Sequence, residues 1–301
     1  MKVLVTGSSG FLGKYILSEL IELGFKVHTL GRKKSSTIFA DLVMDDFNIE
    51  QHYDCIIHVA GKAHSIPKTS LERKEFYDVN LKGTTNLLNA LIKKPKYFIF
   101  ISTVSVYGLD VGKDINEDMP LNSLEPYGQS KLMAEKSVLE WGEKHNVVIT
   151  ILRLPLLFGV NPPGNLNSMI NAIRKGYYFN IDDGNVRKSM VFASDVASFL
   201  PKVATYGGIY NLTDGHHPSF KQLSVIIASH YNVRKPISLP YFFIFIIANC
   251  ADMLQKILKK KMPINKRQLL KMTNSLTFSD QKARKIGWNP KKIIDYPNNW
   301  L

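Results

Sequence analysis

Cysteine is scarce in this sequence, and long apolar runs are missing. The 301 residues include two cysteines, Cys55 and Cys250, and neither has a second cysteine or a histidine at the spacing of metal ligands. We therefore expect no disulfide framework and no metal site. No apolar run reaches the roughly 18 residues that a membrane-spanning helix needs. An apolar strand pattern starts at Val3 and leaves no room for a signal peptide, so we expect a cytoplasmic protein.

Acidic residues are also in short supply, because 39 lysines and arginines face 25 aspartates and glutamates, which gives a net charge of +14. Such a charge suits nucleic acid, an anionic membrane surface, or a phosphate-bearing substrate and cofactor. No zinc finger or RNA-binding aromatic motif accompanies the basic residues. Nucleic acid is therefore not an expected partner.

The first half of the chain alternates short apolar runs with stretches of helical periodicity. Strands that alternate with helices predict an α/β fold, built on a parallel, doubly wound sheet of the Rossmann type. Runs this apolar suit a sheet that is covered on both faces. We expect strands at residues 3–5, 26–30, 55–59, 97–101 and 148–152, and helices at residues 11–23, 81–92 and 130–144.

The alternation becomes less regular after about residue 160. Pro162 and Pro163 open an irregular region, which Pro236 interrupts again. We predict a Rossmann domain at residues 1–160. Residues 161–301 are predicted to form mainly a smaller C-terminal substrate-binding cap, with some segments returning to the first domain.

Three glycines follow the first expected strand at intervals of three residues, where the first helix begins. Glycines there allow a tight turn and a close approach of the backbone to phosphate. The helix N-terminus adds free N–H groups and the positive end of a dipole. We therefore expect this loop to bind the pyrophosphate of a dinucleotide. The residues assigned to it are Gly7, Ser9, Gly10, Phe11, Leu12 and Gly13.

The end of the second expected strand bears on the choice of cofactor. Rossmann proteins that bind NAD usually carry an acid there for the ribose hydroxyls, whereas this chain has Arg32 and basic neighbours. A guanidinium can pair with a 2′-phosphate, so the sequence favours NADP slightly over NAD. Asp41 is a candidate for hydrogen bonding to the adenine, and Leu42 and Ala60 complete this part of the predicted cofactor site.

A strand end and a helix carry the candidate catalytic residues. Thr103 follows an apolar strand, and Tyr127 and Lys131 lie four residues apart, on one face of a helix. A tyrosine phenol has a pKa near 10 and is a poor base at neutral pH. Because a cation one turn away favours the phenolate, we expect Lys131 to lower the pKa of Tyr127. With the Thr103 hydroxyl holding the substrate oxygen, the arrangement predicts proton transfer coupled to hydride transfer.

In this order, the motifs resemble the extended short-chain dehydrogenase/reductases of the NAD-dependent epimerase/dehydratase family. The resemblance covers nearly the whole chain, and it implies an enzyme that oxidises or reduces a nucleotide-linked sugar, usually at C4. It also implies that Tyr127 is the acid/base, that Lys131 holds the nicotinamide ribose, and that Asn80 supports the active site. Further segments that carry it are His58–Gly61, Asp78–Thr84, Arg153–Pro155, Arg187–Val196, Tyr210–Leu212 and Gly287–Pro290.

The same resemblance implies where the substrate binds. Arg187 or Lys188 falls where family members place a cation on the diphosphate of the sugar nucleotide, and Asn165 and Thr103 complete the predicted substrate contacts. The chain departs from the sugar 4,6-dehydratases, which carry an Asp-Glu pair directly after the catalytic hydroxyl. Here Val104 follows, so dehydratase activity is not expected.

Among family members, the sequence looks most like enzymes that make surface polysaccharides. We favour a 4-ketoreductase acting on a UDP-linked N-acetylhexose. The alternative is a 4-epimerase of a UDP-sugar or of an undecaprenyl-diphosphate-linked N-acetylhexosamine. Both reactions share the same step, hydride transfer at C4, so the catalytic residues do not distinguish between them. A non-catalytic nucleotide-binding protein is a distant third interpretation, because Tyr127 and Lys131 are both kept.

Residues 240–248 are apolar on nearly every side, and Lys259, Lys260 and Lys261 follow soon after. One interpretation is a helix buried within the cap. The other is a helix that dips into the membrane interface, with the lysines on anionic headgroups. The second would place the protein peripherally at the inner membrane face, where a lipid-diphosphate-sugar would be within reach. We also expect a homodimer.

Overall fold

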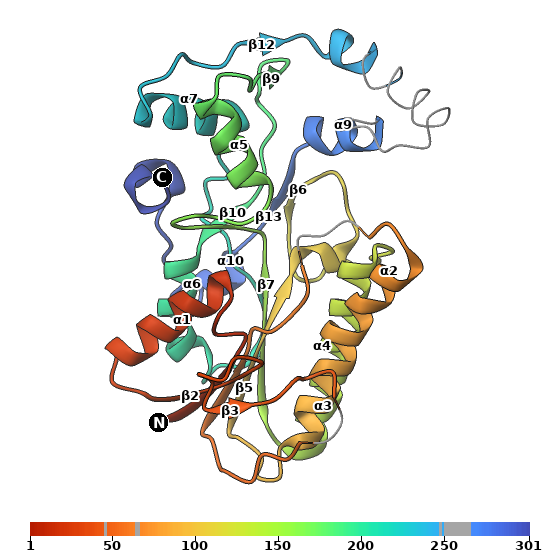
Figure 1. Ribbon diagram of the computed structural model, residues 1–301, viewed down its shortest axis with the longest axis vertical. Helices are drawn as coiled ribbons and strands as arrows, with labels where there is room; N and C mark the ends of the chain where they lie inside the picture. The colour runs from red at the N-terminus through yellow and green to blue at the C-terminus, as the bar shows by residue number, and fades with distance from the viewer. Residues whose placement is uncertain (45–46, 64–66, 247–248, 250–265) are drawn as a thin grey trace.

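A computed structural model of the protein describes residues 1–44, 47–63, 67–246, 249 and 266–301. Seven parallel strands form the central sheet in the order β3-β2-β1-β4-β5-β7-β11 (Figure 1). This order is that of a doubly wound sheet, with the crossover between β1 and β4. The strands are β1 (Lys2–Thr6), β2 (Lys26–Gly31), β3 (Ile38–Phe39), β4 (Cys55–His58), β5 (Tyr97–Thr103), β7 (Val148–Leu154) and β11 (Gly208–Asn211).

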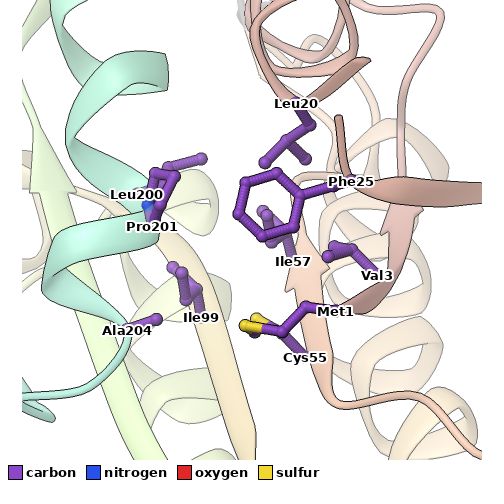
Figure 2. A pocket seen from close by; sticks show the side chains of 10 residues that line it. All are labelled: Met1, Val3, Leu20, Phe25, Cys55, Ile57, Ile99, Leu200, Pro201 and Ala204. Carbon is purple, nitrogen blue, oxygen red and sulfur yellow. The ribbon is translucent and has the colours of Figure 1, made fainter. Parts of the chain in front are cut away.

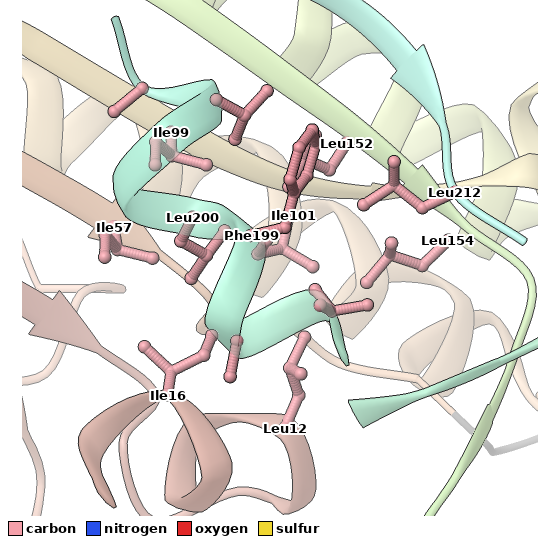
Figure 3. Close-up of a cluster of buried hydrophobic side chains, with 14 of the residues drawn as sticks. Leu12, Ile16, Ile57, Ile99, Ile101, Leu152, Leu154, Phe199, Leu200 and Leu212 are labelled. Atoms are coloured by element: carbon pink, nitrogen blue, oxygen red, sulfur yellow. The ribbon is translucent and has the colours of Figure 1, made fainter. Parts of the chain in front are cut away.

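Helices cover both faces of the sheet, as Figure 1 shows. Neighbouring residues of one strand point to opposite faces, so Ile99 and Ile101 pack under α1 and α6 while Phe98 and Phe100 pack under α3 and α4. Figure 3 shows the first of these two layers, in which α6 lies across the strands. The helices are α1 (Phe11–Glu22), α2 (Ser70–Tyr77), α3 (Gly83–Ala90), α4 (Pro126–His145) and α6 (Ala193–Val203).

Packing between α6 and the sheet is close. The gap between them is apolar and has a volume of about 10 Å³, which is room for one water at most (Figure 2). Cys55 lines this gap, and burial raises the pKa of its thiol to about 12. Cys55 is therefore a core residue without nucleophilic character at neutral pH. Cys250 lies outside the described residues.

The cap is assembled mainly from short elements beyond β7, together with β6, which precedes β7 in the chain. Its own core gathers around Phe158, Ile173 and Phe192, and Trp300 near the C-terminus packs edge-on against Phe158 at 4.9 Å between ring centroids. The cap strands pair as β8 (Leu156–Phe158) with β10 (Met190–Phe192), β9 (Asn180–Ile181) with β12 (Ser238–Leu239), and β13 (Leu276–Phe278) with β6 (Gly112–Ile115). The cap helices are α5 (Asn165–Arg174), α7 (Phe220–His230), α9 (Lys266–Thr273) and α10 (Gln281–Arg284).

A buried ion pair joins α4 to the sheet. The Arg153 guanidinium on β7 donates to the Glu135 carboxylate on α4, with Nη2 2.8 Å from Oε2, and both side chains are 2% exposed. Ser102 on β5 donates to the same carboxylate, and Arg153 Nη1 donates to the Tyr107 hydroxyl at 3.1 Å. Tyr107 donates in turn to Asn211 on β11 at 2.8 Å. Three strands and one helix are thus fixed by one polar network.

The fold confirms the predicted α/β class and parallel sheet. All five expected strands are present, but the third helix begins at Pro126 rather than at residue 130, which places Tyr127 in its first turn. The helix expected at residues 81–92 is preceded by a π-helical turn, Asp78–Lys82. Two segments from beyond residue 160 belong to this part of the fold: β11 is the edge strand of the sheet, and α6 packs on the face of the sheet. Among the described residues, no helix has both the length and the apolar character needed to cross a membrane.

Replacing Glu135 with glutamine should lower the free energy of unfolding by about 3–5 kcal/mol, because Arg153 would remain buried without a counter-charge. Denaturant titration followed by circular dichroism measures the loss. The matched control is Glu140→Gln on the exposed side of the same helix, where a change within about 0.5 kcal/mol is expected. Equal stability of the two variants would show that the pair contributes little.

Candidate active site

The candidate residues gather at the carboxyl edge of the sheet. β1 ends at Thr6, β4 ends at His58 opposite Thr6, and β5 ends at Thr103. All strands of the sheet run in one direction, so these three ends lie along one edge, where open α/β sheets bind their ligands. The loop after β1 and the first turn of α4 meet the same edge.

The glycine loop has little room for side chains. Gly7 has a φ of +68°, and a Cβ there would lie 2.6 Å from the Ala60 backbone nitrogen. A Cβ at Gly13 would lie 2.1 Å from the Gly7 carbonyl oxygen, so α1 can start this close to β1 only with glycine at that position. The backbone at both positions is therefore packed too closely for any side chain.

The N-terminus of α1 is open toward a ligand. Gly10 caps the helix without any side-chain hydrogen bond, and no acid occurs in the first turn. Ser9 and Gly10 are exposed, Phe11 is half-buried against Tyr15, and Leu12 belongs to the core. Free N–H groups at the positive end of a twelve-residue helix fit the pyrophosphate that the sequence predicted here.

The loops after β2 and β3 meet beside this site. Arg32 is largely exposed, and its Nη1 lies 4.0 Å from Asp41 Oδ2. Asp41 also accepts a hydrogen bond from the Val43 backbone, and the Leu42 carbonyl accepts one from Asn86. The one guanidinium predicted to meet a 2′-phosphate is therefore next to a carboxylate, which would repel that phosphate.

Thr103, Tyr127 and Lys131 come together from β5 and α4. Thr103 is buried at the end of β5, where its Oγ1 accepts a hydrogen bond from the Ser105 backbone at 3.2 Å. Lys131 is also buried, with Nζ 4.0 Å from the centroid of the Phe100 ring. Burial lowers the pKa of Lys131 to about 7, although Glu135 one turn further along α4 opposes the shift.

The pKa of Tyr127 differs from the expectation. Burial raises it above its usual value, and a hydrogen bond with Thr103 opposes that shift in part. The sequence predicted that Lys131 would lower this pKa, and in the protein alone that prediction is wrong. The physical reason is that removing the phenol from water disfavours the charged phenolate. Burial also lowers the pKa of Lys131, so near pH 7 a smaller fraction of this amine carries a positive charge.

Asn80 connects the π-helical turn to α4. Its Oδ1 accepts from the Lys62 backbone at 2.7 Å, and its Nδ2 donates to Ser130 Oγ at 3.0 Å. Ser130 donates to the Tyr127 carbonyl at 2.9 Å. The sequence named Asn80 as a supporting residue, and the structure places it under the first turn of α4.

His58, which the sequence placed within a motif without a predicted role, is buried and supports the loop. His58 Nδ1 lies 2.6 Å from Thr6 Oγ1, and its Nε2 lies 2.9 Å from Thr84 Oγ1. Burial is the main cause that lowers the pKa of His58 to about 3, and the positive charge of Lys131 is the second. The ring is therefore neutral. The Thr6 hydroxyl also accepts from the Ala60 backbone at 3.2 Å. A run of hydroxyl and imidazole groups thus holds β1, β4 and α3 together.

The predicted substrate residues lie on the cap. Asn165 is exposed at the start of α5. Arg187 is exposed and donates from Nη1 to the His217 carbonyl at 2.9 Å, while Lys188 is half-buried and pairs through its backbone with Leu276. These cap residues and the three catalytic candidates come from different elements, and their roles stay predictions.

Comparison with known proteins agrees with this geometry. Residues 3–213 match the family model described as the NAD dependent epimerase/dehydratase family. The chain is 30% identical to the N-acetyl-alpha-D-glucosaminyl-diphospho-ditrans,octacis-undecaprenol 4-epimerase of Escherichia coli O157:H7, over 95% of this chain and 89% of that protein.

Solved structures share the fold. The UDP-glucose 4-epimerase of Thermus thermophilus in complex with NAD superimposes with a TM-score of 0.70 at 20% identity, covering 97% of this chain and 94% of that one. A human epimerase family protein with NADPH gives 0.72 at 17% identity, covering 96% and 95%. The Rossmann fold, the open helix end and the family match together identify this chain as an enzyme of the NAD-dependent epimerase/dehydratase family that uses a nicotinamide cofactor.

Proposed function

We propose that this enzyme is a 4-epimerase of a diphosphate-linked N-acetylhexosamine, with undecaprenyl diphosphate as the carrier. The observation that carries the proposal is the 30% identity, over nearly the full length of both chains, to an epimerase acting on such a substrate. The 4-ketoreductase that the sequence favoured finds no comparable support. The presence of Thr103, Tyr127 and Lys131 is consistent with either reaction.

The residues of the site divide the chemistry between them. Thr103 holds the sugar C4 oxygen, and Tyr127 takes the proton from the C4 hydroxyl and later returns it. Bound NAD supplies the acceptor, and then the donor, of the C4 hydride. Lys131 stabilises the phenolate of Tyr127 and holds the ribose. In an epimerase the 4-keto sugar rotates within the site, so that its other face is reduced.

An epimerase returns its cofactor to the starting state in every cycle, so it has no need to exchange it. The carboxylate of Asp41 beside Arg32 favours NAD over NADP, because it would repel a 2′-phosphate. We therefore propose NAD as a retained cofactor. This choice replaces the slight preference for NADP that Arg32 suggested in the sequence.

The first test concerns the acid/base. Tyr127→Phe should reduce turnover by about a hundredfold or more, because a positioned proton donor and acceptor is lost. NAD binding and the unfolding transition should be unchanged. The control is Tyr231→Phe, which removes a cap hydroxyl that donates to the Leu301 carbonyl at 3.4 Å. Turnover of Tyr127→Phe close to that of the control would remove Tyr127 from the mechanism.

A second test separates the two reactions. Purified enzyme should interconvert undecaprenyl-diphosphate-linked N-acetylglucosamine and N-acetylgalactosamine without added cofactor, and denaturation should release NAD. Chromatography of the sugars freed by mild acid measures the products. Turnover of a 4-keto sugar that consumes one added NADPH per product, with no interconversion, would favour the reductase instead.

The third test concerns Arg32. If Asp41 holds its guanidinium, Arg32→Ala should change the affinities for NAD and NADP by similar small factors. Pairing with a 2′-phosphate would instead make the loss selective for NADP and about ten- to a hundredfold, the size of a charge-assisted contact. Fluorescence titration with both reduced cofactors distinguishes these results, and Lys33→Ala is the neighbouring control.

A further inference from the structure

One end of the cap exposes large apolar side chains. In the helical turns that follow β12, Phe242 is 66% exposed, Phe243 58% and Ile246 43%. Helix α9 adds Leu270 and Met272, at 44% and 46%. Figure 1 shows both helices at the end of the cap that lies away from the N-terminus. We call these five residues the apolar tip.

The underside of the apolar tip is packed. Ile244 is 1% exposed and Leu269 is fully buried, and they share a small core with Ile181 of β9. Tyr241 and Phe245 stack at 5.7 Å between ring centroids and join the same core. One face of the segment is therefore buried, as the first interpretation of the sequence expected, and the other face is exposed, which leaves the membrane interpretation open to test. Ile247, Ala248 and Lys259–Lys261 lie outside the described residues.

The sequence around the apolar tip is strongly basic. Arg234 and Lys235 are exposed just before β12. From residue 234 to 272 the sequence holds nine lysines and arginines against a single acid, Asp252. An apolar helical face flanked by basic residues is the pattern that binds the interface of an anionic bilayer. A second copy of this chain, itself at +14, would bring like charges to this surface.

The apolar tip leads directly to the predicted diphosphate site. After α9 ends at Thr273, Ser275 Oγ accepts from the Arg187 backbone at 3.0 Å, and Leu276 pairs with Lys188. The backbones of Arg187 and Lys188, the cations predicted for a substrate diphosphate, thus contact residues that lie two and three positions after the end of α9. Helix α9 carries two of the exposed apolar side chains. A lipid-linked diphosphate has the same order of parts, since its charged groups lie at headgroup level beside its apolar chain.

We propose that the apolar tip inserts into the surface of an anionic lipid bilayer, so that the enzyme takes its substrate there. The purpose of this contact rests on the proposed lipid-linked substrate, but the contact itself can be measured without any substrate. Basic residues attract the anionic headgroups, and the phenyl rings supply the apolar burial that holds the cap at the interface.

The test is cosedimentation of the NAD-loaded enzyme with vesicles of phosphatidylcholine, with and without phosphatidylglycerol. Binding should require phosphatidylglycerol and weaken as salt rises. Phe242→Ser should reduce the partition coefficient about tenfold, and Phe242→Ser/Phe243→Ser further. The matched control is Leu71→Ser on α2, because Leu71 is 67% exposed, as Phe242 is 66%. Arg234→Gln/Lys235→Gln should reduce binding severalfold and flatten its dependence on salt.

Other results would overturn the proposal. These are an absence of binding by the unaltered enzyme at low salt, an equal loss in Phe242→Ser and Leu71→Ser, or a dimer that Phe242→Ser/Phe243→Ser converts to monomers without any effect on vesicles. Epimerisation of a detergent-dispersed lipid-linked sugar without vesicle binding would retain the proposed function and reject the apolar tip. Vesicle binding without epimerisation of that sugar would do the reverse.

Discussion

The geometry of the site depends on the buried ion pair between Glu135 and Arg153. Both side chains are 2% exposed, and buried charges are stable only while they remain paired. A shift or rotation of α4 on the sheet would separate them and carry a large cost in free energy. Lys131 lies one turn before Glu135, and Ser102 precedes Thr103 directly. Fixing this pair therefore fixes α4, with its candidate catalytic residues, relative to the end of β5.

Burial also sets the charge of the site before any ligand arrives. It lowers the pKa of Lys131 to about 7 and the pKa of His58 to about 3. The phosphate groups of a dinucleotide and of the proposed diphosphate-linked substrate are negative, and negative charge near an amine raises its pKa. In the mechanism proposed above, the charge on Lys131 would then depend on which ligands are bound.

Much of the fold and part of the site could be predicted because their signals are local. The three glycines lie within the seven residues from Gly7 to Gly13, and Tyr127 and Lys131 are four residues apart. The partner of Glu135 is Arg153, on another element, and no spacing rule identifies it. The raised pKa of Tyr127 and the neutral state of His58 depend on burial by distant segments, which a sequence pattern does not report.

The chain order of the sheet has a consequence for synthesis. The edge strand β11 and the covering helix α6 come after the cap segment from β8 to β10, residues 156–192, yet α6 packs on the same core as β1, β4 and β5. While the ribosome is still adding the cap, the apolar face made by Val3, Ile57 and Ile99 has only α1 to cover it. We expect nascent chains that end near residue 160 to be captured by chaperones, and protease resistance of that face to develop only once α6 has emerged.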